Sequence, residues 1–344
     1  MIVSFIKIAL QRCLPATALQ SLRAAFHRWR DRVALRRSMA YDHRRFADGA
    51  GLFRAETHAP SIEASLIKAY HRIEKGLALR EPRPGFGRDA VEAVLLDAQR
   101  LLACLGPQRS VTRALAALDE YVHFHLAQGV DLAWLLPRLT ALRQAQGRSA
   151  IAGEGGTVLV ERARIHAAAR LDLADFFARR HSIRQFSAEP VAASLVAQAV
   201  AMAQKTPSVC NRESGMVHAA FEPGIKERLL ALQNGNRGFG EQAGCVLVVT
   251  SRLDTFLSVG ERYQGWIDGG MFAMSLVYAL HSLGLGSCCL NWSVEPEADI
   301  ALRRVGGIPD DQLLIMLLAV GHLPERLRVA QSPRRPLDDV LKIL

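Results

Sequence analysis

The chain has 344 residues, half of them hydrophobic and only 6% aromatic, and it carries a formal net charge of +10. This length leaves room for one large domain or two ordinary ones, with ample material for a buried core. No apolar run reaches the length of a bilayer span, and the six cysteines show neither a C-x-x-C pair nor zinc-like spacing. A membrane-spanning helix and a zinc site are therefore excluded, and free thiols in a reducing compartment are the simplest interpretation.

The positive charge is concentrated at the N-terminus. Residues 1–50 contain ten lysines and arginines against three aspartates, which is +7 of the total. Four interpretations are open: a basic amphipathic helix on an anionic membrane surface, an organellar transit peptide, a cleaved signal, or an additional helix packed on the body. The signal fits least, because the charges follow the apolar part. Nucleic-acid binding is not expected, because the arginines lack interleaved aromatic residues beyond Phe26 and Trp29.

Residues 60–145 have the three- and four-residue apolar spacing of amphipathic helices. Ile62 to Leu77 predicts the first helix, and the proline- and glycine-rich residues 80–87 predict the loop that follows it. Ser110 is the expected N-terminal cap of a later helix, because its hydroxyl can accept a hydrogen bond from a free backbone N–H.

The glycine-rich stretch 152–157 is the best linker in the chain. We therefore predict a basic segment (1–50), a helical domain (51–165) and a mixed domain (166–344) in which helices alternate with short apolar strands. The strands are expected at 216–221, 245–250, 284–291 and 313–320, and the helices at 191–204, 224–232, 265–283 and 296–305.

An unusually polar bend separates two apolar helical runs of the mixed domain. Residues 179–186 include three arginines, a histidine and a serine, whose guanidinium forks and hydroxyl suit an anion such as phosphate. Two further segments offer polar groups, the loop 206–215 and the turn at Gly284 and Gly286, where backbone N–H groups can be approached closely. Taken singly, each has a simpler structural explanation, as a solvated helix end, a turn cap or a tight turn.

In combination and order, these segments resemble the nitroreductase family of FMN-dependent oxidoreductases over roughly residues 172–344. The matching marks are Arg-Arg-His-Ser-Ile-Arg-Gln-Phe, Thr-Pro-Ser-Val-Cys-Asn-Arg, a long helix of small residues, Leu-Gly-Leu-Gly-Ser-Cys, Leu-Ala-Val-Gly-His-Leu-Pro-Glu and Arg-Arg-Pro-Leu-Asp-Asp-Val. The helical region before them is similar to the N-terminal extension of one branch of that family. The resemblance implies an α+β fold with a mostly antiparallel central sheet flanked by helices, preceded by an all-helical region. It also implies a homodimer with flavin at the subunit interface.

The flavin contacts of the family correspond here to Arg180, His181, Ser182 and Arg184 in the bend, Pro207, Ser208 and Asn211 in the loop, Arg237 (or its neighbour Asn236), Gly286, Ser287 and Cys288 in the turn, and Arg334. By this resemblance the bend holds the phosphate and a ring edge, with Arg334 closing on the phosphate. The loop would lie beside the isoalloxazine, the turn near its reactive N5, and Arg237 at the pyrimidine side.

Two positions depart from the family pattern. Members often read Asn-x-Gln-Pro-Trp where this chain has residues 211–215, which lose the tryptophan and place Glu213 where an amide is usual. Ser332 stands where some members carry a second basic residue. We therefore expect flavin binding, with a substrate pocket that differs from the usual one.

The resemblance implies hydride transfer from NAD(P)H through flavin N5 to an organic acceptor, with a nitro compound or a quinone as the default. Because the cofactor supplies the chemistry, no catalytic side chain and no metal ligand are expected. Two alternatives stay open: a flavin-dependent tailoring enzyme for cell-envelope or polysaccharide precursors at the membrane surface, and a non-catalytic relic of the fold that binds a partner. We expect a cytoplasmic protein, with peripheral contact at the inner face of the membrane if the basic N-terminus binds lipid.

Overall fold

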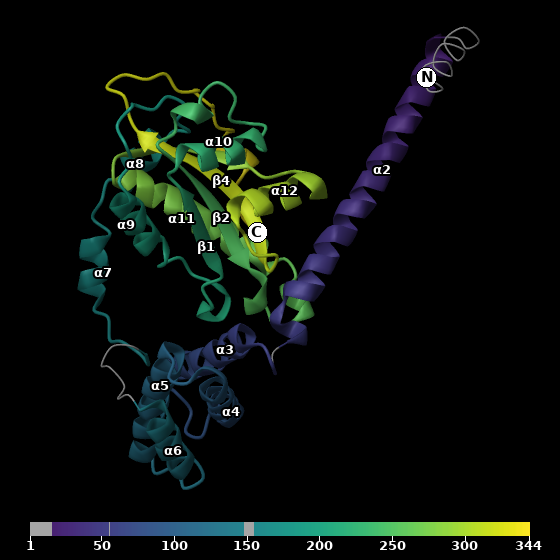
Figure 1. Ribbon diagram of the computed structural model, residues 1–344. Helices are drawn as coiled ribbons and strands as arrows, with labels where there is room; N and C mark the ends of the chain where they lie inside the picture. The colour runs from purple at the N-terminus through teal and green to yellow at the C-terminus, as the bar shows by residue number, and fades with distance from the viewer. Residues whose placement is uncertain (1–15, 55, 148–154) are drawn as a thin grey trace.

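The computed structural model describes residues 16–54, 56–147 and 155–344. Figure 1 shows three parts: a long projecting helix α2 (Ala16–Gly49), a bundle of helices, and a sheet with helices on both faces. The first apolar stretch of the basic segment and the first half of the predicted linker lie outside the described residues. None of the described helices is long and apolar enough to cross a membrane.

The bundle contains α3 (Ala59–Leu77), α4 (Arg88–Leu105), α5 (Arg109–Ala127) and α6 (Leu136–Gln146), which confirms the predicted helical region. The apolar stripe of α3 is buried as its spacing predicts. Ile62, Leu66 and Ile73 have no exposed surface, and they share one core with apolar residues of α4, α5 and α6. The bundle therefore has a hydrophobic core of its own.

The predicted cap of α5 was wrong. Ser110 lies inside the first turn and is buried, whereas Gln108 occupies the position before the helix. The side chain of Gln146, from the end of α6, accepts a hydrogen bond from the Gln108 backbone N–H (3.2 Å) and donates one to its carbonyl (2.9 Å). A side chain from another helix thus fixes the backbone at the start of α5.

The mixed part is built on four strands in the order β1-β2-β4-β3, and every neighbouring pair is antiparallel. The strands are β1 (Gly215–Ala220), β2 (Cys245–Arg252), β3 (Leu285–Asn291) and β4 (Gln312–His322). All four lie where the sequence predicts strands. The fold is α+β with an antiparallel sheet, as expected.

Helices cover both faces of this sheet. They are α9 (Ala193–Ala203) and α11 (Gln264–Ser282) on one face and α10 (Pro223–Ala231) and α12 (Pro296–Gly306) on the other, preceded in the chain by α7 (Arg162–Ala168) and α8 (Leu173–Arg179). Successive residues of a strand point to opposite faces, so Val246 and Val248 belong to one core and Leu247 and Val249 to the other. The central strand β2 is buried almost throughout for this reason.

The base of α2 is attached to the sheet domain through Asp299 of α12. The Tyr41 hydroxyl (2.7 Å) and the Arg45 guanidinium (2.9 Å) donate to its carboxylate, as does Arg303 (2.8 Å) from α12 itself. Burial alone would raise the pKa of Asp299, but the arginine charges and the hydrogen bonds outweigh it, so the pKa is lowered. The rest of α2 extends away from the body (Figure 1).

Candidate functional site

The polar bend is seated on the sheet edge at β3. The backbone N–H of Ile183 donates to the carbonyl of Ser287 (2.9 Å), and Ser182 pairs with Ser287 in a short parallel bridge. Glycines make room for the bend: a Cβ on Gly286 would lie 3.0 Å from the Ile183 side chain, and one on Gly321 would lie 2.6 Å from Phe186. The close approach of the bend to two strands therefore requires glycine at both positions.

Two of the three arginines of the bend have no acidic partner in the part of the chain that the structure describes. Among the described residues, no carboxylate forms an ion pair with Arg180, His181 or Arg184, although Arg179 next to them pairs with Asp175. Arg180 is half-buried and Arg184 exposed. Their guanidinium groups and the nearby Ser182 hydroxyl are therefore available to an anion.

The predicted turn lies against this bend. Gly286, Ser287 and Cys288 are all buried. Burial raises the pKa of the Cys288 thiol, and the neighbouring Arg184 charge opposes that effect only in part. The structure thus brings the turn and the bend together.

Arg237 and Arg334, the other two basic residues predicted to contact flavin, form no hydrogen bond or ion pair with the bend among the described residues. Arg237 is exposed on a loop that reaches the bend, since the Arg184 guanidinium lies 6.0 Å from the ring centre of Phe239. Arg334 is exposed and donates to the Ser332 carbonyl (2.9 Å), and no hydrogen bond or ion pair joins it to the bend within the described residues.

The loop with Pro207, Ser208 and Asn211 forms a second group. It connects α9 to β1, and the backbone N–H of Val209 donates to Asp268 near the start of α11 (3.1 Å). Pro207 and Asn211 are exposed, and Ser208 is half-buried. A cavity of about 140 Å³ opens beside the loop and is lined by Pro207 and Ser208 together with the Asp268 carboxylate.

These two groups lie at opposite corners of the sheet. On the bend side, Ser287 pairs with Val320 of β4. On the loop side, Gly215 pairs with Ser251 of β2, which in turn pairs with Leu313 of β4. Val320 and Leu313 are seven residues apart on β4, which corresponds to roughly 24 Å along the strand. The three strand spacings from β3 to β1 add roughly 14 Å across the sheet. A single chain therefore does not bring the predicted flavin contacts into one site.

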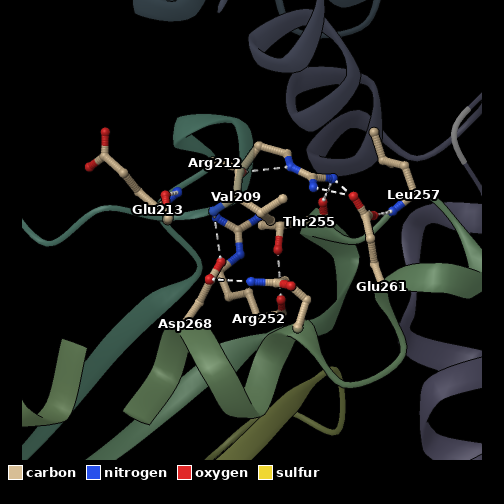
Figure 2. A network of polar contacts seen from close by, with 10 residues as sticks. Val209, Arg212, Glu213, Arg252, Thr255, Leu257, Glu261 and Asp268 are labelled. Carbon is tan, nitrogen blue, oxygen red and sulfur yellow. Dashed lines mark hydrogen bonds and ion pairs between the residues drawn. The ribbon is translucent and has the colours of Figure 1, made fainter. Parts of the chain in front are cut away.

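Sequence reasoning missed a buried polar network behind the loop, which Figure 2 shows. The side chain of Arg212 is 1% exposed and donates to both carboxylate oxygens of Glu261, at 2.5 and 3.2 Å. It also donates to the carbonyls of Val209 (3.1 Å) and Thr255 (2.6 Å). Nothing in the sequence links Arg212 with a partner 49 residues away, so no pattern could have indicated this pair.

Glu261 is held in place as tightly as Arg212. The backbone N–H of Leu257 donates to its carboxylate (2.7 Å). Burial alone would raise the pKa of Glu261, but the bonds from Arg212 and Leu257, with the charge of Lys68 on α3, outweigh it and lower the pKa. The carboxylate is therefore ionised at neutral pH and forms a bidentate charged pair with Arg212.

The helical bundle also packs against this loop. Its helix α3 packs against the 3₁₀ turns η2 (Val209–Asn211) and η4 (Leu253–Thr255). Tyr70 of α3 is buried, and burial, with the neighbouring Glu74 charge, raises its pKa to about 12. The charges of Arg113 and of Glu213 in the loop also act on this hydroxyl, so bundle and loop meet in one electrostatic environment.

The donor set of the bend fits the phosphate of FMN. A stretch of backbone fixed to β3 carries a hydroxyl, an imidazole and two guanidinium groups that pair with no carboxylate of the described residues. These are donors that a phosphate monoester requires. By contrast, no group of three or more metal-ligand side chains occurs among the residues that the structure describes.

Comparisons with solved structures return nitroreductases. The chain is similar to an FMN-dependent nitroreductase from Clostridium difficile R20291 (19% identity, TM-score 0.39, covering 46% of this chain and 91% of that one). It is also similar to a nitroreductase family protein from Streptococcus pneumoniae TIGR4 (19%, 0.43, 50% and 100%) and to NfrA1 nitroreductase from B. subtilis (24%, 0.44, 50% and 73%). A search of the curated proteins found no match.

A family model gives the more specific result. Residues 218–322 match the model described as the nitroreductase family, a range that contains the turn of β3 and Arg237 but begins after the bend and the loop and ends before Arg334. Within the sheet domain, residues 218–322 therefore match the nitroreductase family, and a helical region precedes them in the chain.

Proposed function

We propose that this chain is an FMN-dependent oxidoreductase that transfers reducing equivalents from NAD(P)H to a flat organic acceptor such as a nitro compound or a quinone. The family match over residues 218–322 supports an oxidoreductase role. The cofactor assignment rests on the bend, where Arg180, His181 and Arg184 have no acidic partner among the described residues. Bound FMN would supply the hydride chemistry, accepting at N5 and passing electrons on.

In this proposal the side chains of the protein bind and orient. Arg180 and Arg184 would neutralise the phosphate, and the Ser182 hydroxyl would donate to it. The hydrogen bond from the Ile183 N–H to the Ser287 carbonyl fixes the position of the bend relative to β3. The electrostatic contribution of the chain is thus a preorganised positive end for an anionic cofactor.

We further propose that the site is completed by a second copy of the chain. The bend and the loop lie at opposite corners of one sheet, so a partner that supplies its loop to the bend of the first protomer would complete the contact set. The start of α11 supports such contact, because Trp266 and Ile267 in its first turn and Tyr263 just before it are exposed. Cytoplasmic location is part of the same proposal.

The first experiment is the absorption spectrum of the purified protein, followed by identification of any released chromophore. We expect flavin bands, release of FMN, and oxidation of NAD(P)H on addition of a quinone. A colourless protein that neither binds added FMN nor oxidises NAD(P)H would overturn the proposal.

Subunit complementation tests the shared site. Arg184→Ala and Asn211→Ala would each damage every site of a homodimer. Random mixing after dissociation would produce heterodimers with one intact and one doubly damaged site, so about a quarter of the wild-type sites would return. If both residues serve one site within a single chain, mixing restores nothing.

A second candidate function, modification of a cell-envelope precursor at the membrane surface, is favoured by α2. Leu22, Phe26, Trp29 and Val33 follow one another at spacings of four and three residues, and all four are exposed. Arginines surround this apolar stripe, as in helices that lie on anionic membranes. Sedimentation with vesicles of phosphatidylserine, but not of phosphatidylcholine, is expected. Its persistence in a Phe26→Ser/Trp29→Ser variant would exclude this function of α2.

A further inference from the structure

The loop between α9 and β1 has an uncommon backbone. Cys210, Asn211 and Glu213 have φ angles of 51°, 54° and 49°, in the left-handed region that residues with a side chain rarely adopt. Such conformations persist only where the surrounding structure imposes them. Because Asn211 is one of the proposed flavin contacts, whatever imposes this backbone also sets the position of that contact.

Arg212 is the exception within this run. Its φ is −84°, and its side chain leaves the loop in the direction opposite to that of Glu213, as Figure 2 shows. Glu213 is exposed, whereas Arg212 reaches inward to Glu261 and to the carbonyls of Val209 and Thr255. The guanidinium therefore ties two parts of the sheet domain to the strained loop at once.

The loop is held from further directions as well. The Ser208 hydroxyl accepts from the backbone N–H of Glu213 (3.0 Å), and the Asp268 carboxylate accepts from that of Val209 (3.1 Å). The bundle helix α3 packs against the turn η2 that contains Asn211. The loop is thus held by the Arg212–Glu261 pair, by α11 and by the helical bundle.

We propose that Arg212, clamped by Glu261, is a positioning residue that holds the flavin-side loop in its left-handed conformation. This inference rests on the proposed function for its consequence, FMN affinity, but not for its structural content. Arg212 touches neither cofactor nor substrate in this proposal and acts through the backbone of Asn211. Removal of the pair would leave a folded protein whose loop samples other conformations and binds flavin more weakly.

The test uses the full-length protein and two conservative variants. Arg212→Lys keeps the charge but loses the planar fork, and Glu261→Gln keeps the shape but loses the charge. Hydrogen exchange is measured for the peptide that spans residues 206–216 and for peptides of the bundle core, and the dissociation constant of FMN is measured by fluorescence. Arg143→Lys, in the exposed Arg143–Asp119 ion pair of the bundle, is the matched control.

We expect exchange of the loop amides to accelerate at least tenfold in both variants, with bundle peptides unchanged, and FMN affinity to fall at least tenfold. The double variant should be no worse than the more damaged single one, because the two residues act as a unit. The control should behave as wild type. If either single variant unfolds, exchange accelerates in every peptide, and the other variant then decides.

Unchanged loop exchange in Arg212→Lys and Glu261→Gln would overturn the positioning role. If the loop loosens but FMN affinity stays the same, the loop is not a flavin contact, and the consequence for the cofactor is wrong. A wild-type protein that binds no FMN would refute the proposed function instead, while the exchange data would still decide the role of the pair.

Discussion

Two adjacent glycines in α11, Gly269 and Gly270, allow a test of the contact between this helix and the sheet. The effect of alanine on helix propensity is the same at both positions, so it cancels when the two variants are compared. Alanine at Gly269 and at Gly270, one at a time, should each gain about 0.5–1 kcal/mol of helix propensity. A Cβ on Gly270 would meet nothing within 4 Å. A Cβ on Gly269 would lie 2.6 Å from Cδ1 and Cγ1 of Ile315 and 3.3 Å from Cβ of Ser251.

The contact at Gly269 determines the magnitude. Carbon atoms pack at about 3.5–4.0 Å, so 2.6 Å requires a new rotamer of Ile315 or a shift of α11. Ser251 lies on β2, is fully buried and stands 3.3 Å from the same Cβ position, so the methyl group has no free space on that side either. Overpacking of this kind costs about 1–3 kcal/mol. The expected free energy of unfolding is therefore lower by up to about 2 kcal/mol in Gly269→Ala and higher by about 0.5–1 kcal/mol in Gly270→Ala.

Urea denaturation followed by far-UV circular dichroism, at one protein concentration, measures both changes. The difference between the two variants contains only the contact term, because the propensity gain is common to both. Equal midpoints for the two variants would refute the packing described here. A destabilising Gly270→Ala would show that this side of α11 is covered, as a subunit contact would do.

Three further predictions concern charges and thiols. Asp299→Asn should lower the free energy of unfolding by about 3 kcal/mol at neutral pH, because Arg45 and Arg303 lose their buried partner. Because the pKa of Asp299 is lowered by folding, the ionised carboxylate stabilises the folded state above the pKa of the unfolded carboxyl. This stabilisation is lost as the pH falls through the folded pKa. The free energy of unfolding should therefore depend less on acidic pH in Asp299→Asn than in the wild type. Arg184→Gln should raise the dissociation constant of FMN about 10- to 100-fold, measured by fluorescence titration, and an unchanged constant would remove Arg184 from the phosphate site. Iodoacetamide should modify Cys289 slowly in the native protein, because the residue is exposed although burial and the neighbouring Cys288 raise the pKa of its thiol. Cys245, whose pKa burial raises to about 12, should stay unmodified, and mass spectrometric mapping would show its native modification if this is wrong.

The secondary structure could be predicted from the sequence because its signal is local. In α3 the buried residues Ile62, Leu66 and Ile73 recur with the helical period, and the β-branched run of β2 marks a strand covered on both faces. Where a distant residue decides, local reasoning failed. The start of α5 depends on Gln146 from α6, so the local candidate Ser110 was the wrong choice.

The candidate site was predictable by composition but not by arrangement. The bend and the turn meet because Ile183 and Ser287 pair across a sheet edge. The separation of the loop from the bend follows from the strand order, and the Arg212–Glu261 pair from tertiary packing; neither leaves a periodic trace in the sequence. The left-handed backbone at Asn211 was equally hidden, because asparagine tolerates but does not require it.

The long helix α2 also sets a distance. Arg37 joins it to α12 through an ion pair with Glu297. From Ala16 to Arg37 the helix rises roughly 32 Å, so its tip stands about the diameter of a small domain beyond its point of attachment. A molecule bound at the first turns of α2 would therefore be held at that distance from the sheet domain. A force applied there would act, through the length of the helix, on the hydrogen bonds of Tyr41 and Arg45 to Asp299.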